Sequence, residues 1–142
     1  MKAISVQQPW AWALFNGKPV ENRIWSAAHR GPLLIHAAKK MGDWHAFMKI
    51  WEPLGIAVPT VNILERGGII GIVDMVDVVH QHDSPWFFGP RGWVFENPRR
   101  VEFVPFRGLP GIFDVPEEAV KIICPQIAQM AADKITTPQC GG

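Results

Sequence analysis

The chain has 142 residues, 48% of them hydrophobic, with 14 basic and 13 acidic side chains and a formal net charge of +1. This length corresponds to about one domain, and the apolar content suffices for a buried core. The near-neutral charge excludes the polybasic class of nucleic-acid binders, so any contact with a nucleic acid must be local.

Cysteine and histidine usage argues against a metal site. The cysteines Cys124 and Cys140 form no CxxC pair, so they predict neither a zinc site nor a disulfide framework. The motif His80-Gln81-His82-Asp83 is unspecific without further ligands, and we predict no metal and no cofactor. No apolar stretch reaches the roughly 18 residues that a membrane span requires, so we expect a cytoplasmic location and no membrane partner.

The first part of the chain predicts strands around one short helix. Residues 2–6 have the pattern of a strand, and residues 9–15 that of a helix with proline at its first position and a C-cap at Asn16-Gly17. Residues 20–25 and 32–37 predict two further strands.

A second helix and a central strand are predicted next. Asp43 is a residue type that caps helix N-termini, and four apolar residues follow it at helical spacing, namely Trp44, Phe47, Met48 and Trp51. Residues 68–79 form the longest apolar run and are rich in β-branched side chains, which predicts a central strand buried on both faces.

The last third predicts mainly strands. Residues 92–96 and 100–104 are expected to pair as a hairpin across Asn97-Pro98. A short strand around Ile112 and Phe113 follows, then a helix from near Glu117 that is bent or divided at Pro125, then a flexible tail over residues 134–142.

These elements favour an α+β fold. About six short strands with two or three flanking helices fit a small β-barrel better than a doubly wound sheet. Because there is no repeat and no linker, residues 1–133 are predicted to form a single domain.

The densest polar cluster follows the first helix. It consists of Lys18, Glu21, Asn22 and Arg23, with Arg30 nearby. Strand alternation puts Glu21, Arg23 and Trp25 on one face. Two cations and a carboxylate can bind a nucleobase edge through the carboxylate and a phosphate or 2′-hydroxyl through the cations. The same residues could instead form a structural ion pair at a strand end.

Neighbouring residues supply further candidates. Trp10 and Trp25 flank the cluster and would wall a nucleobase pocket. Gln8 could form hydrogen bonds with a base edge, or it could cap the N-terminus of the helix. His36 could contact a base or act as an acid or base, or be a satisfied structural histidine.

An aromatic run and a basic rim complete the candidates. Trp86 begins the run with Phe87 and Phe88, one of which would either stack on a base or cap the barrel. The basic residues near the predicted hairpin form either a solvated face or a row that binds the phosphates of a nucleic acid. They are Arg91, Arg99, Arg100 and Arg107.

The run NGKPVENR, from Asn16 to Arg23, resembles the GxKxxExR signature of the ASCH domain family, which has a PUA-like β-barrel fold. Other segments resemble the family in the expected order: QPWAWAL, ENRIW, RGPLLIHA, GIIGIVDMVDVV and FFGPRGWVFENPRRV. The resemblance covers roughly residues 1–116. It implies a module that binds RNA or a nucleotide, with Lys18, Glu21 and Arg23 in its cleft.

Two departures from the family pattern leave the activity open. Asn16 replaces the first glycine of the signature, and Glu21 stands where relatives that hydrolyse N4-acetylcytidine carry a threonine nucleophile. A carboxylate is a poor replacement for a hydroxyl nucleophile. The first hypothesis is therefore a nucleic-acid-binding module. The alternatives are a hydrolase, either amidohydrolase or ribonuclease, with Lys18 and Glu21 as acid and base, and a protein-interaction adaptor.

Overall fold

The structure is a computed structural model that describes residues 1–55, 57 and 59–120. Within these residues, six strands form one sheet in the order β2-β5-β4-β3-β1-β6. The strands are β1 (Lys2–Val6), β2 (Val20–Arg23), β3 (Gly31–Ala37), β4 (Gly68–Val79), β5 (Arg91–Pro105) and β6 (Ile112–Asp114). Neighbouring strands are antiparallel, except that β1 and β3 are parallel.

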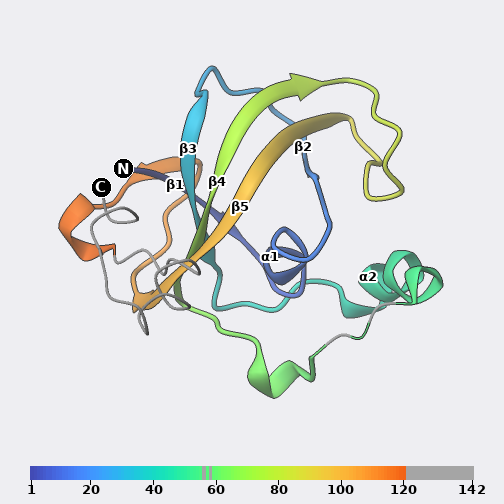
Figure 1. Cartoon of the computed structure of the whole chain (residues 1–142), viewed down its shortest axis with the longest axis horizontal. Coiled ribbons are helices and arrows are strands. Elements are labelled where there is room, and N and C mark those ends of the chain that lie inside the picture. The colour runs from blue at the N-terminus through green and yellow to red at the C-terminus, as the bar shows by residue number, and fades with distance from the viewer. Residues whose placement is uncertain (56, 58, 121–142) are drawn as a thin grey trace, which may run out of the picture.

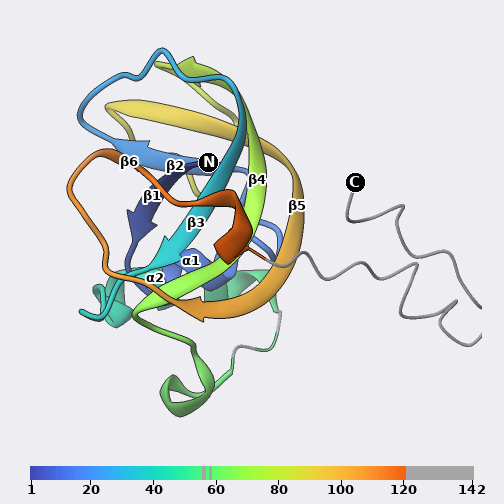
Figure 2. The ribbon, with the colours of Figure 1, turned by 90° about the vertical axis from the view of Figure 1, so that its left-hand side faces the viewer.

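The sheet is curled into a half-barrel (Figures 1 and 2). Two α-helices, α1 (Trp10–Ala13) and α2 (Trp44–Trp51), lie toward one end of it. Parallel neighbours need a crossover connection, and the segment that carries α1 and β2 supplies it between β1 and β3. The predicted α+β fold with about six strands and flanking helices is therefore confirmed.

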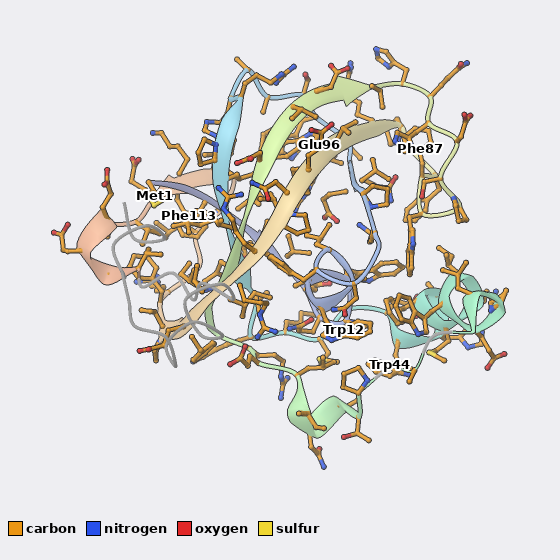
Figure 3. All side chains as sticks on the ribbon, in the orientation of Figure 1. Met1, Trp12, Trp44, Phe87, Glu96 and Phe113 are labelled. Atoms are coloured by element: carbon orange, nitrogen blue, oxygen red, sulfur yellow. The ribbon has the colours of Figure 1, made fainter. Side chains whose placement is uncertain are left out.

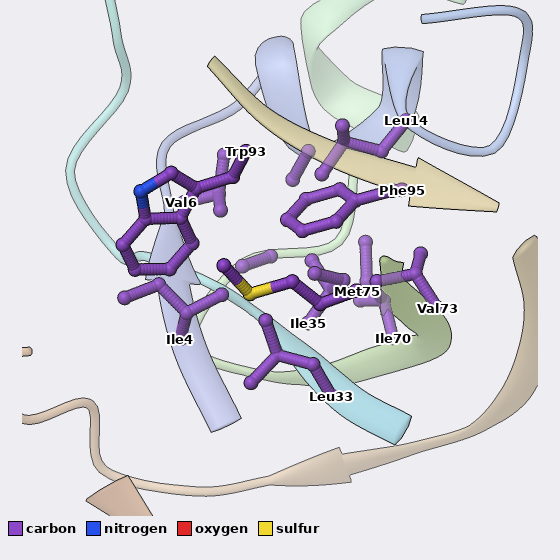
Figure 4. Close-up of a cluster of buried hydrophobic side chains, with 12 residues drawn as sticks. Ile4, Val6, Leu14, Leu33, Ile35, Ile70, Val73, Met75, Trp93 and Phe95 are labelled. Atoms are coloured by element: carbon purple, nitrogen blue, oxygen red, sulfur yellow. The ribbon is translucent and has the colours of Figure 1, made fainter. Parts of the chain in front are cut away.

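The main core lies inside the curve of the sheet. Ala11 and Leu14, at α1, pack there against side chains from β1, β3, β4 and β5 (Figure 4). Successive strand residues point to opposite faces. Leu33 and Ile35 of β3 therefore join this core, whereas Leu34 joins a second cluster on the other face.

A third cluster is aromatic and attaches α2 to the rest of the fold. Phe47, Trp51 and Trp86 are each at most 2% exposed. The ring of Phe47 stacks on Trp51 with a centroid distance of 5.5 Å, and Trp10 meets Phe47 edge-on at 5.3 Å. In Figure 3 the labelled Trp12 marks this side of the molecule, away from Met1 and Phe113.

The helix boundaries follow local signals. Asp43 caps α2 as predicted, since its Oδ1 accepts a hydrogen bond from the backbone N–H of Ala46 at 3.0 Å. Gly55, with a φ of 70°, ends the following 3₁₀ turn (Glu52–Leu54) in the left-handed region. Within the described residues, no helix has the length and apolarity to cross a membrane.

The predicted hairpin at Asn97-Pro98 is wrong. Residues 92–96 and 100–104 belong to the single strand β5, which pairs along its length with β4. Asn97 has a φ of 50°, and the register with β4 shifts at this point, close to Asp74. Proline lacks the N–H that a strand ladder needs, so the turn-like dipeptide is accommodated as a bulge instead of a chain reversal.

Other elements differ in extent. α1 is shorter than predicted, and β2 ends at Arg23, after which Ile24 is 82% exposed. Near the C-terminal end of the described chain, Glu117–Ala119 form a 3₁₀ turn. The predicted helix with its bend at Pro125 and the predicted tail at residues 134–142 lie outside the described residues.

The aromatic cluster predicts a large stability difference between two phenylalanine truncations. Phe47→Ala should lower the free energy of unfolding by about 3–5 kcal/mol, because the fully buried ring leaves a cavity. Phe88→Ala should change it by less than about 0.5 kcal/mol, because Phe88 is 64% exposed. Urea unfolding of both variants measures this, and similar midpoints would contradict the described packing of α2.

Candidate functional site

Three charged side chains meet at β2 and the turn before it. Lys18 Nζ lies 2.8 Å from Glu21 Oε1, and Arg23 Nη2 lies 3.2 Å from Glu21 Oε2. Glu21 and Arg23 share a face of the strand because side chains alternate, as predicted. Lys18 reaches the same carboxylate from the turn after α1. We call Lys18, Glu21 and Arg23 the charge triad.

The charge triad is largely removed from water. The side chains are 1% exposed for Lys18, 11% for Glu21 and 22% for Arg23. The Lys18 ammonium also donates to the carbonyl of Val20 at 2.6 Å and lies 5.9 Å from the centroid of the Trp10 ring. Removing charges from water is expensive, and these partners offset the cost. The carboxylate is thus held in one position between two cations.

The Arg23 guanidinium is fixed but not fully paired. Its Nη2 donates to the carbonyl of Ser5 at 2.9 Å, and its central carbon lies 5.8 Å from the ring of Trp93. Among the described residues, the buried Nε has no partner. Nη1 likewise makes no hydrogen bond within that part of the chain and remains available as a donor.

A pocket of about 370 Å³ opens beside the charge triad. We call it the Glu21 pocket, and its lining residues are Ser5, Val6, Gln7, Trp10, Glu21, Asn22, Arg23 and Ala38. Ligand sites in proteins begin at about 300 Å³, so the volume is sufficient for a small ligand. Lys18 does not line the pocket, because it lies behind Glu21.

The Trp10 wall of the Glu21 pocket is held by close packing. Gly42 approaches the Trp10 ring so closely that a Cβ at this glycine would lie 3.0 Å from ring atoms. On another side lies the exposed ring of Phe88, whose centroid is 6.3 Å from that of the Trp10 ring. Asn22 fixes the loop of Phe88, since its Oδ1 accepts from the Phe88 backbone N–H at 2.9 Å and its Nδ2 donates to the carbonyl of Trp86 at 2.9 Å.

Gln8 is occupied by the fold. It is 2% exposed, its Oε1 accepts from the backbone N–H of Trp12 at 2.9 Å, and its Nε2 donates to the carbonyl of Glu65 at 2.8 Å. These bonds tie the start of α1 to the segment before β4. Pro9 is the N-cap residue of α1, and Gln8 bonds to the helix from the position before it.

Four other predicted residues lie outside the Glu21 pocket. Trp86 is buried in the aromatic cluster, and Trp25 packs edge-on against Trp93 at 4.7 Å. Arg30 is exposed and donates to carbonyls of its own loop. His36 is 3% exposed and lines a neighbouring pocket.

Sequence reasoning missed the pocket residues at the ends of β1 and β3. Ser5 and Ala38 stand near the ends of β1 and β3, and Gln7 follows β1. They carry no polar cluster or motif of their own. The parallel pairing of β1 with β3 brings them together, and a pattern confined to one segment does not reveal such a contact.

The histidines of the HxHD motif have separate partners. His80 Nε2 lies 3.4 Å from Arg91 Nη1, and His82 Nδ1 accepts from the backbone N–H of Ser84 at 3.0 Å. Within the part of the chain that the structure describes, no group of three or more metal-ligating side chains could hold an ion.

The family model of the ASCH domain matches residues 4–105. The chain belongs to the ASCH domain family. No curated protein matched the chain in sequence. Membership of the ASCH family indicates an RNA-binding-type module in general terms, and the matched range contains the charge triad and every residue of the Glu21 pocket.

We predict a strong energetic coupling between Lys18 and Glu21 in this ASCH domain. Lys18→Met should destabilise the fold by about 2–4 kcal/mol, because Glu21 stays buried with Arg23 as its remaining partner. In the Lys18→Met background, Glu21→Gln should lower the free energy of unfolding by much less than it does in the unmodified domain. Urea unfolding of the two single variants and the double variant measures this coupling.

The exposed pair of Lys2 and Asp114 is the control. Lys2 Nζ lies 2.9 Å from Asp114 Oδ1, and the hydrogen bond and charge of Lys2 lower the pKa of Asp114 from its ordinary value. Because water screens this pair, the same cycle with Lys2→Met and Asp114→Asn should give a much smaller coupling. Equal coupling energies in the two cycles would show that water screens the charge triad as strongly as it screens the exposed pair.

Proposed function

We propose that this ASCH domain binds RNA or a nucleotide-like ligand, with one base in the Glu21 pocket. The observation that carries the proposal is the carboxylate of Glu21, held between Lys18 and Arg23 at the edge of that pocket. A carboxylate has about four acceptor positions, of which these two cations use two. It can therefore accept hydrogen bonds from the amino or imino groups of a base edge.

The other side chains of the pocket complement this acceptor. Trp10 offers an aromatic surface for stacking on a base, and Arg23 Nη1 is a donor for a base carbonyl, a 2′-hydroxyl or a phosphate oxygen. Lys18 acts from behind, because it fixes the position of the Glu21 carboxylate. With one negative and two positive charges, the charge triad favours a ligand that presents both base N–H groups and anionic oxygens.

A pair of arginine variants tests the proposal. Arg23→Ala should weaken binding of single-stranded RNA by about tenfold or more, because a hydrogen bond to a charged group in a shielded site contributes about 1.5–3 kcal/mol. Arg99→Ala should change it by less than about twofold, because Arg99 pairs with Asp74 away from the Glu21 pocket. Fluorescence anisotropy with labelled RNA of mixed sequence measures both affinities.

Folding must be checked in the same samples. Circular dichroism and urea unfolding show whether Arg23→Ala keeps the native fold at the assay temperature. Equal losses of affinity in the two variants would place the RNA site elsewhere, and the absence of any RNA binding by the unmodified domain would favour the protein-interaction alternative.

A hydrolase is the second candidate, and the direct Lys18–Glu21 contact supports it. A carboxylate that lines a pocket and bonds to a buried ammonium at 2.8 Å has the arrangement of an acid–base pair. In such a reaction Glu21 would contact the substrate or an attacking water, and Lys18 would act through Glu21.

The hydrolase candidate predicts turnover that depends on the Glu21 carboxylate. Incubation with N4-acylated cytidine and with RNA should release product from the unmodified domain, and Glu21→Gln should reduce the rate by about 100-fold or more, the usual contribution of a general acid or base. Product analysis by liquid chromatography measures both reactions. Binding of RNA without any product would retain the binding module and exclude these two reactions.

A further inference from the structure

A larger cavity adjoins the Glu21 pocket. It has a volume of about 800 Å³ and lies between the ends of β1 and β3, the start of β4 and residues 105–110 after β5. Ser5 and Ala38 line both cavities. We call the larger one the Arg107 pocket. The shared residues make the two pockets neighbours without an intervening element.

Hydrogen bonds hold the Arg107 pocket in a defined shape. His36 Nε2 lies 2.7 Å from the carbonyl oxygen of Phe106, and its Nδ1 lies 3.0 Å from Ser5 Oγ. A carbonyl only accepts, so Nε2 carries the proton, and in the neutral imidazole the Ser5 hydroxyl then donates to Nδ1. Backbone bonds from Phe106 N to Gly67 O at 3.1 Å and from Gly67 N to Ala37 O at 2.7 Å anchor the same segment.

Residue 108 must be glycine for this segment to lie so close to His36. A Cβ at Gly108 would lie 2.7 Å from His36 Cε1 and 3.3 Å from Ser5 Oγ. The wall formed by residues 105–110 therefore packs directly on the imidazole. A pocket with this many fixed contacts exists before any ligand arrives, which lowers the conformational cost of binding.

The charged residues that line the Arg107 pocket are both basic. They are Lys39 and Arg107, and no acidic side chain lines the cavity. Both are exposed, and the described structure gives neither side chain an acidic partner. In contrast, Arg99 and Arg100 of the predicted basic rim pair with Asp74 and Glu65, respectively. Among the four rim arginines, Arg107 is the one that lines the cavity next to the Glu21 pocket.

We propose that the two pockets form one continuous site for a single-stranded RNA segment of at least two nucleotides. One base occupies the Glu21 pocket, the chain crosses Ser5 and Ala38, and the adjoining phosphate and nucleotide occupy the Arg107 pocket. Lys39 and Arg107 bind the phosphate, and the apolar wall of Phe106 and Leu109 contacts the second nucleotide. This inference rests on the proposed function of the Glu21 pocket, and it adds the length and path of the ligand.

The test measures how the affinity for a labelled pentaribonucleotide of mixed sequence depends on the salt concentration. The variant Lys39→Gln/Arg107→Gln should weaken binding by about tenfold near physiological salt. It should reduce the slope of log affinity against log salt by about 0.7, because the one phosphate bound by Lys39 and Arg107 is no longer neutralised. The control Lys49→Gln/Arg99→Gln removes the same charge from outside both pockets and should keep affinity and slope close to those of the unmodified domain.

Arg23→Ala on the same RNA separates the two proposals. If Arg23→Ala weakens binding and Lys39→Gln/Arg107→Gln behaves like the control, the extended site is refuted and the Glu21 pocket is retained. If the Lys39/Arg107 variant weakens binding and Arg23→Ala does not, the continuous site is refuted together with the proposed base pocket. The extended site is supported only if both variants weaken binding and the control does not.

Discussion

The burial of the Lys18 ammonium against the Glu21 carboxylate is the contact on which the candidate site depends. A lysine at 1% exposure would be very costly alone, so the fold must supply both the carboxylate and the carbonyl of Val20. Buried ion pairs contribute little net stability compared with apolar packing. Their value here is geometric, because a carboxylate with a cation close to each oxygen has a fixed position and still has acceptor positions left for a ligand.

The topology of the sheet determines what surrounds that carboxylate. Because β1 lies parallel to β3, the chain passes through α1 and β2 between them, and this connection carries Trp10 and the charge triad to the ends of both strands. The same ends contribute Ser5 and Ala38. On the other side of these two residues, His36 holds the segment after β5. One pair of strand ends therefore borders two cavities with different charge.

Individual residues show where a local pattern was sufficient and where it was not. Alternation in β2 correctly placed Glu21 beside Arg23, because a period of two holds wherever a strand forms. Asn97-Pro98 suggested a chain reversal, but the long strand β4 offered enough partners for β5 to continue through a bulge. The burial of Trp86 depends on Phe47 and Trp51, which lie far away in the sequence, so the aromatic run by itself could not decide between stacking on a base and packing against the fold.

By itself, the sequence determined the class of fold, most of the strands, the cap of α2 and the three charged residues of the signature, because these follow from local spacing, capping and a family motif. Only the tertiary structure decided that Lys18 lies behind Glu21, that Gln8 is used by the fold, and that Ser5 and Ala38 join two pockets. Lys18 and Glu21 are only three residues apart, but which of them faces the pocket depends on β1 and Ala38, and Gln8 also bonds to Glu65, far along the chain. Such contacts are determined by the packing of the curled sheet and leave no periodic trace in the sequence.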